Sequence, residues 1–375
     1  MDFDMINNDQ KKKKKKKKII LIVLISVLVL LIGGALAYYF LVMKKEEPKP
    51  EPPKPVVVKK LKIVDEDSNA RPIAVMIDNN VGASSHKGLQ DAYITYEAIV
   101  EGSLSRIMVV YKDKDVKKIG PVRSSRHYFL DYALESDAIY AHFGWSPYAQ
   151  RDIKKLDVNN INGLYDSDPF KRVSDYEAPH NVFTSTEKLY KYASKLGYKT
   201  ETEDWKLLNY NVDDVNLDKI YKDDPNLKEV SDISFSYMSG EKRSFKYDSA
   251  NKDYLRYMYG KPHTDAETKK QYHYKNLIFI KVSNTLLDAK RWDLATTGTG
   301  EGYYLTNGYM IPITWQKDSR SSKSKYLYKG KEIEINDGNT FIEVLPKNKK
   351  IKYTEVPKET NSANASPTNT NKTES

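Results

Sequence analysis

The residues of this sequence that could do chemistry are concentrated between positions 97 and 127. Glu97 and Glu101 lie an even number of positions apart in a segment that alternates like a strand, so both side chains are expected on one face. Arg106 follows a short turn and faces Glu101 if the hairpin is regular. A desolvated glutamate in such a setting can act as a general acid. Glu97 and Glu101 are therefore the candidate catalytic residues.

The segment Ile119 to His127 (IGPVRSSRH) adds basic groups to this region. Proline is favoured at the first position of a helix, so Pro121 predicts a helix running to about Leu134. Arg123 and Arg126 then project from its first turns, where the helix dipole disfavours cations. Two arginines in that place need an anionic partner. Either an acidic ligand or the two glutamates of the hairpin, as a structural network, could supply it.

A second polar group, Pro179-His180-Asn181, precedes a predicted helix. Proline and asparagine are usual in turns, so a helix-entry turn explains this group as well as a binding site does. The candidate substrate-binding residues are Arg106, Arg123, Arg126, His127, His180 and Asn181.

Signatures of common enzymes and cofactor sites are mostly absent. With no cysteine in 375 residues, disulfides, thiolate metal sites and lipidation on cysteine are excluded. The histidines lack ligand spacing, and the glycines at 298–302 precede a strand rather than open a helix. Ser185 to Lys188 matches SxxK without its companion motifs. We therefore expect neither a metal nor a cofactor.

The N-terminus predicts a membrane anchor. Residues 1–18 contain eight consecutive lysines, and residues 19–43 carry no charge. A helix of that stretch spans roughly 37 Å at ~1.5 Å per residue, enough for about 30 Å of bilayer hydrocarbon. A secretory signal peptide is the alternative, but its apolar region is shorter. The positive-inside rule places the lysines in the cytoplasm and the C-terminal domains outside.

The remaining chain divides by composition. Residues 44–60 are proline-rich and predict an extended spacer, and residues 356–375 predict a disordered tail. Between them we expect an α+β domain over 61–215 and a β-rich domain over 225–350. The predicted helices cover 121–134, 147–156 with Ser146 as N-cap, and 184–196 with a Thr184/Glu187 capping box. The predicted strands cover 71–78, 92–101, 106–111, 138–143, 276–282, 302–306, 310–315 and 331–335.

Several of these segments resemble the YerB-like lipoprotein family of Gram-positive envelope proteins. The resemblance covers roughly 65–347 and rests on Arg71–Asn79, Tyr96-Glu97, Val100–Gly102, Ile119–Arg126, Pro179–Asn181, Thr314-Trp315 and Asp337–Thr340. It implies an α+β core followed by a β-rich part, and it supplies no catalytic assignment. Because this chain has no cysteine, its apolar helix would replace the lipid anchor.

Location narrows the expected function. Little nucleotide is present outside the membrane, whereas cell-wall polymers are abundant there. Half of the net charge of +10 lies in the first 18 residues, so no nucleic-acid partner is expected. The leading hypothesis is a membrane-anchored protein that binds a wall glycan, peptidoglycan. Cleavage of that glycan in a lytic-transglycosylase-type reaction is a further hypothesis, not a requirement of the first. The alternative is a non-enzymatic scaffold or accessory module, whose partner is an envelope protein or a wall polymer.

Overall fold

The computed structural model describes residues 3–43, 59–80, 85–102, 104–237 and 240–356. The predicted spacer and tail lie almost wholly outside these residues. The chain forms two compact units, 1–58 and 59–375. In the first, helix α1 (Phe3–Tyr38) continues into a π-helical turn at Tyr39–Met43. This helix is long and apolar enough to cross a membrane, and its apolar side chains over residues 19–42 are exposed.

The second unit is built on a large mixed sheet. Its pairings give the order β5-β4-β1-β3-β2-β22-β14-β17-β18-β19-β20. The bounds are β1 Ile73–Asp78, β2 Ile94–Ile99, β3 Ser105–Tyr111, β4 Ile139–His142, β5 Asn160–Asn162, β14 Asn276–Val282, β17 Gly298–Thr306, β18 Tyr309–Lys317, β19 Lys325–Tyr328, β20 Lys331–Glu332 and β22 Thr340–Pro346. The strands at its centre read as nearly continuous apolar runs, because both faces of the sheet are covered.

A second, antiparallel layer of strands, which we call the second sheet, covers one face and is joined to the large sheet where Tyr309 and Met310 of β18 pair with Glu229 and Lys228. It runs β23-β9-β10-β11, and the short strands β12 and β13 also pair with β11. The bounds are β9 Lys228–Ser236, β10 Lys242–Asp248, β11 Asp253–Met258, β12 Lys261–Pro262, β13 His273–Tyr274 and β23 Lys352–Glu355. Aromatic rings fill the space between the sheets: Phe235 packs on Phe279 at 5.8 Å between centroids, and Phe245 packs on Phe341 at 5.3 Å.

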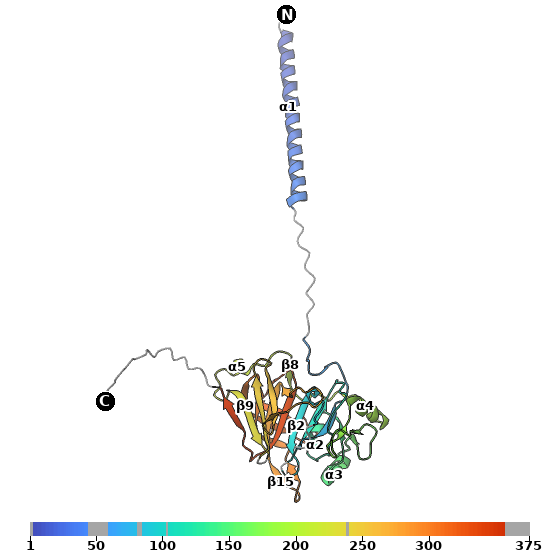
Figure 1. The fold of residues 1–375 in the computed structure, drawn as a ribbon. Coiled ribbons are helices and arrows are strands. Elements are labelled where there is room, and N and C mark those ends of the chain that lie inside the picture. Colours follow the sequence, from blue (N-terminus) through green and yellow to red (C-terminus); the bar gives the residue numbers. More distant parts are fainter. Residues whose placement is uncertain (1–2, 44–58, 81–84, 103, 238–239, 357–375) are drawn as a thin grey trace, which may run out of the picture. The chain divides into compact units, whose positions relative to one another are not determined.

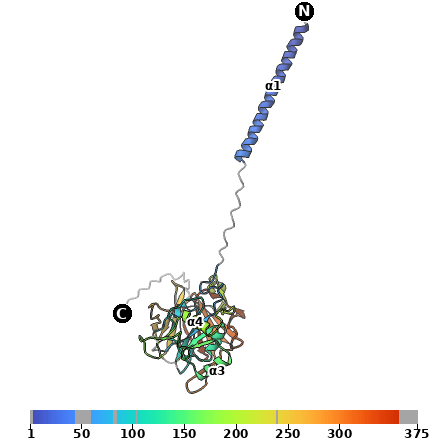
Figure 2. The same ribbon diagram turned by 90° about the vertical axis from the view of Figure 1, so that its right-hand side faces the viewer.

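Helices lie on the other face. Tyr96 stacks on Tyr132 of α2 (Phe129–Leu134) at 4.6 Å, whereas the next residue, Glu97, points toward the second sheet. Figure 2 shows α3 (Pro147–Lys155) and α4 (Thr186–Lys195) on the side that faces the viewer. The remaining elements are η2 Leu89–Asp91, β6 Lys171–Arg172, β7 Val182–Phe183, β8 Tyr210–Asn211, α5 Leu217–Ile220, β15 Asn284–Leu286, β16 Trp292–Leu294 and β21 Ile335–Asn336.

The expected fold class is confirmed: a mixed α/β part precedes a β-rich part. The two parts nevertheless share one sheet, because residues 94–98 of β2 pair in parallel with residues 340–344 of β22. Figure 1 shows the earlier strands and helices (cyan to green) and the later strands (yellow to red) side by side in one body. The two expected domains therefore pack together in one compact unit, residues 59–375.

The predicted helix from Pro121 is wrong in its first eight residues, since α2 begins only at Phe129. The segment before it is extended between two neighbours. Val122 N–H donates to Val182 O at 2.7 Å, and Arg123 N–H donates to Met76 O at 2.9 Å. These tertiary bonds outweigh the local preference of proline for a helix start.

Helix caps were predicted with mixed success. Ser146 caps α3 as expected, and its side chain accepts from Ala149 N–H. The cap of α4 is Ser185 rather than Thr184, whose hydroxyl instead donates to Pro169 O at 2.8 Å. Among the strands, the predicted 331–335 is in fact divided between β20 and β21.

Candidate functional site

The site lies where several strands of the large sheet end. β1, β4 and β5 are mutually parallel, and both β1 and β2 are antiparallel to β3. The carboxyl ends of β1, β2, β4 and β5 therefore meet at one edge, which is where ligands bind in open α/β sheets. We call the polar group at this edge the strand-end site: Asp78, Glu101, Arg106, Arg123, Arg126, His127, His180 and Asp293.

Asp78 ends β1 and organises one half of the strand-end site. One of its carboxylate oxygens contacts Arg123 Nε at 2.9 Å and His180 Nδ1 at 2.6 Å. The Asp78 side chain is almost fully buried, whereas those of Arg123 and His180 are 25% and 20% exposed. A buried carboxylate thus holds two partly exposed basic groups at the rim.

Glu101 organises the other half. Its carboxylate accepts a hydrogen bond from Arg126 Nε at 2.6 Å and pairs again with the same guanidinium through Nη2. Arg106 Nη2 lies 3.7 Å from the second oxygen of Glu101, but the two residues do not face each other across the strands as expected, because Arg106 is opposite Ala98 in the register. Burial, followed by the nearby Arg126, lowers the pKa of Arg106 to about 10.

The later part of the chain completes this edge. His127 Nε2 lies 2.7 Å from a carboxylate oxygen of Asp293 in β16. The β15–β16 hairpin rests on the turn after β2, where Trp292 Nε1 donates to Gly102 O at 3.1 Å. Asn181 lies outside the site, because its side chain bonds to Arg172 and to Val173 O within the preceding turn. Sequence reasoning missed Asp78 and Asp293, which are single acids without a distinguishing pattern.

An apolar rim borders the strand-end site, formed by Trp145, Leu164 and Tyr165. Leu164 is 58% exposed and the next residue, Tyr165, is 71% exposed. Trp145 and Tyr165 lie 5.6 Å apart between ring centroids. The rim lies near the segment that carries Arg123 and Arg126. Gly144 lies between them, since a methyl group placed on it would contact both Leu164 of the rim and the side chain of Ser124.

Glu97 is not part of the strand-end site. It projects from the face of β2 that is turned toward the second sheet and has no exposed surface. Because β2 ends at Ile99, Glu101 lies beyond the strand, and the prediction that Glu97 and Glu101 share one strand face is wrong. The carboxylate of Glu97 accepts from Asn79 Nδ2 at 2.7 Å, from Ser105 Oγ at 2.6 Å and from Arg243 Nε at 3.2 Å. It also pairs with Arg256. Burial acts to raise the pKa of Glu97, but the charges of the two arginines outweigh it and the pKa is lowered.

Glu343 stands beside Glu97 in the register of β22 with β2. Burial, followed by the negative charge of Glu97, raises the pKa of Glu343 well above its usual value. Tyr237 donates to Glu343 Oε2 at 3.0 Å and lies 3.1 Å from Glu97 O. We call Glu97, Glu343, Arg243 and Arg256 the buried network; it contains one ionised and one neutral carboxyl between the two sheets.

Two histidines connect the buried network to the strand-end site. The geometry fits a directed chain in which Arg256 donates to His263 Nδ1, His263 Nε2 to His86 Nδ1 at 2.8 Å, and His86 Nε2 to Asp78 O. Burial lowers the pKa of His86 to about 4, and burial followed by Arg256 lowers the pKa of His263. Both imidazoles are therefore neutral, as this chain of donors requires.

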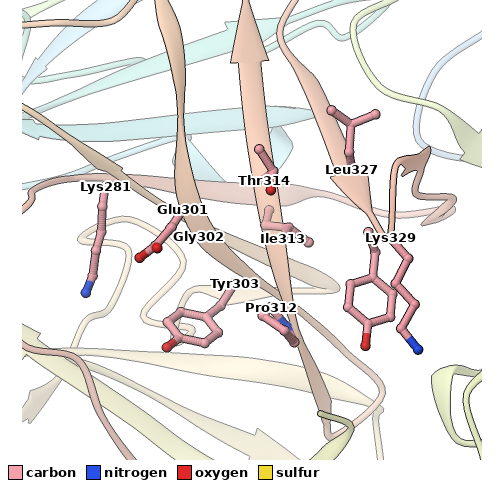
Figure 3. A pocket seen from close by; sticks show the side chains of 10 residues that line it. Lys281, Glu301, Gly302, Tyr303, Pro312, Ile313, Thr314, Leu327 and Lys329 are labelled. Carbon is pink, nitrogen blue, oxygen red and sulfur yellow. The ribbon is translucent and has the colours of Figure 1, made fainter. Parts of the chain in front are cut away.

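A hollow of about 310 Å³ lies over β17, β18 and β19, where Tyr303 is opposite Phe279 and therefore shares the face of the large sheet that carries the second sheet. Figure 3 shows Tyr303 and Pro312 between Lys281 at one end and Lys329 at the other. Its charges are mixed, because Glu301 lies beside Lys281 and Lys329 pairs with Asp224. Among the described residues, no three His, Cys, Asp or Glu side chains are grouped as metal ligands.

The fold and the site together define a class: a two-sheet α+β protein with an arginine–carboxylate cluster at its strand ends and a sealed ionic network between its sheets. Sequence profiles of the family described as "Protein of unknown function (DUF3048)" match this chain, the N-terminal domain at residues 61–199 and the C-terminal domain at 233–342. The chain belongs to this family of YerB-like proteins.

Named relatives agree with this assignment. "Putative lipoprotein YerB" of Bacillus subtilis (strain 168) is 29% identical over 291 residues, which cover 76% of this chain and 84% of that protein. The crystal structure of the YerB protein from Bacillus subtilis matches with a TM-score of 0.67 at 27% identity, covering 76% of this chain and 94% of that one.

Proposed function

We propose that this protein is an extracytoplasmic cell-envelope protein that binds peptidoglycan at its strand-end site and is held at the membrane by residues 19–43. The lysines at 11–18 before the apolar helix favour a cytoplasmic N-terminus. A relative named as a lipoprotein supports attachment to a membrane surface. In this chain, which has no cysteine, the helix takes the place of a lipid.

The observation that carries the proposal is Arg123 at the sheet edge, next in the chain to Ser124, whose side chain lies near the apolar rim. Arg123 uses Nε to contact Asp78, and its side chain is one quarter exposed at the edge of the sheet. A guanidinium suits a carboxylate, and exposed aromatic and aliphatic side chains suit the faces of sugar rings. Peptidoglycan offers both, because its peptides carry carboxylates along a glycan strand.

Binding has more support than cleavage. A general acid must carry a proton and reach the glycosidic oxygen. Glu97 is sealed between two arginines that lower its pKa, and Glu101 is bound to Arg126. Neither carboxyl is placed as an acid over an open cleft. A binding role is also compatible with service as an accessory module of a wall complex.

Co-sedimentation tests this proposal. Full-length protein in a neutral detergent is mixed with purified peptidoglycan sacculi stripped of other polymers, and the bound fraction is measured. We expect Arg123→Gln to weaken binding by about tenfold, the value of one charge-assisted contact. Lys195→Gln is the matched control, because it removes one charge from an exposed position on α4. Equal binding by all three proteins contradicts the proposal, and soluble sugar products released by the parent protein would show cleavage.

A further inference from the structure

The outer face of the second sheet carries a group of lysines that the strand-end site does not use. Phe235 points inward against Phe279, so its neighbours Ser234 and Ser236 point outward. In the register, Lys242 of β10 lies opposite Ser236, and Lys352 of β23 lies opposite Ser234. Side chains from three adjacent strands thus meet on one outward face.

These residues line a hollow of about 380 Å³, which we call the lysine hollow. It is lined by Ser234, Phe235, Ser236, Lys242, Lys350 and Lys352. Its lining therefore contains three ammonium groups and two hydroxyls but no carboxylate. The volume is within the range of small-ligand sites, roughly 300–1,000 Å³.

The acids of these strands lie outside the lining of the hollow. Asp232 lies opposite Lys246 and Thr354, further along the sheet. Glu355 pairs with Lys228. Within the described part of the chain, Lys242, Lys350 and Lys352 form no ion pair with an acid. Lys347 and Lys349, in the turn before β23, add further positive charge to the same end of the sheet.

Three like charges around one hollow repel each other unless an anion lies between them. Lysine acts as a point charge toward phosphate, and serine hydroxyls add neutral donors to phosphate oxygens. We propose that the lysine hollow binds the phosphate groups of a phosphodiester-linked anionic polymer of the cell envelope. This site is separate from the strand-end site, and its occupant differs from the carboxylate-bearing glycan proposed there.

A polymer fits this surface better than a membrane does. Surfaces that dock on bilayers combine basic residues with exposed apolar side chains that enter the headgroup region. The only apolar side chain in the lining is Phe235, which is 3% exposed and packed in the core. The hollow therefore offers charge and hydrogen-bond donors without an apolar surface for insertion.

The test uses full-length protein in neutral detergent micelles and a fluorescent poly(glycerol phosphate) oligomer, with binding followed by anisotropy. We expect the triple variant Lys242→Gln/Lys350→Gln/Lys352→Gln to bind at least about tenfold more weakly and to lose most of the dependence on salt. The control is Lys154→Gln/Lys155→Gln/Lys191→Gln, which removes the same charge from exposed positions on α3 and α4. Circular dichroism verifies that both variants fold.

Two results would overturn the inference. Equal weakening in both triple variants would mean that the oligomer responds only to overall charge. If native mass spectrometry from micelles containing phosphatidylglycerol finds retained lipid that the hollow variant alone loses, the occupant is a lipid headgroup. Arg123→Gln should keep full affinity for the oligomer, so failure at the strand-end site and failure at the lysine hollow are distinguishable.

Discussion

Glu97 and Glu343 lie side by side on β2 and β22, and their environments separate their protonation states. Glu97 has the two buried arginines Arg243 and Arg256 as partners, whereas Glu343 has the hydroxyl of Tyr237 and the repulsion of Glu97. Two adjacent buried carboxylates cannot both ionise at low cost. The pair therefore consists of one buried carboxylate, Glu97, and one buried neutral acid, Glu343.

This difference predicts that replacing each glutamate by glutamine has unequal effects on the stability of the protein. Glu97→Gln leaves two buried guanidinium groups without their anion and should lower the free energy of unfolding by about 3–5 kcal/mol. Glu343→Gln replaces a neutral acid by a neutral amide and should change it by less than about 1 kcal/mol. Urea unfolding of residues 59–375 at pH 7 measures both. Equal destabilisation by the two substitutions would contradict the assigned protonation states.

The histidine chain predicts a loss of stability in mild acid. The pKa of His86 is lowered from 6.5 to about 4 in the folded state, so the unfolded chain binds a proton that the folded chain does not between these values. The free energy of unfolding should therefore fall as the pH drops from about 6.5 to 4, by roughly 3 kcal/mol for this group.

Urea unfolding at pH 7, 6 and 5 measures that slope, with His86→Gln as the comparison. Glutamine retains a side-chain donor but does not titrate, so the slope should become shallower in the variant. His142, whose pKa burial also lowers to about 4, contributes equally to both proteins. Parallel pH curves for the two proteins would show that His86 does not titrate as assigned.

Local signals predicted those elements whose causes are local. Residues 276–282 contain the apolar run Leu277 to Ile280 and form β14 with the expected bounds, and α3 begins directly after its serine cap. The extended course of Val122 and Arg123 depends on strands at Met76 and Val182, which no window of sequence contains. Contacts of that kind become visible only in the folded chain.

The partners of Glu97 were missed for the same reason, since Arg243 and Arg256 are 146 and 159 residues away. One signal was nonetheless available. Arg256 alternates in phase with the buried Tyr254 and Met258, as Arg243 does with Phe245. An arginine at an inward position of a strand requires a buried anion, and few glutamates in the sequence lie within strands buried on both faces.

The proposed orientation of the anchor predicts a labelling pattern. Because the chain has no cysteine, a single introduced thiol reports its own location. A membrane-impermeant maleimide on intact cells should label Ser375→Cys but not Asn7→Cys. Replacing Lys11 to Lys18 by glutamine removes the positive-inside signal and should reduce correct insertion and thus the labelling of Ser375→Cys. Protection of Ser375→Cys in the parent chain would contradict the proposed orientation.

The exposed Tyr165 and the half-buried Tyr303 test where the glycan binds. Tyr165 borders the strand-end site and Tyr303 lies in the hollow of Figure 3, so each offers an aromatic face on a different surface. If sugar rings pack on the apolar rim, Tyr165→Ala should weaken co-sedimentation with sacculi by about fivefold, equivalent to about 1 kcal/mol of ring contact. Tyr303→Ala should leave the bound fraction unchanged. The reverse result would move the glycan to the hollow over β17 and β18 that Tyr303 lines.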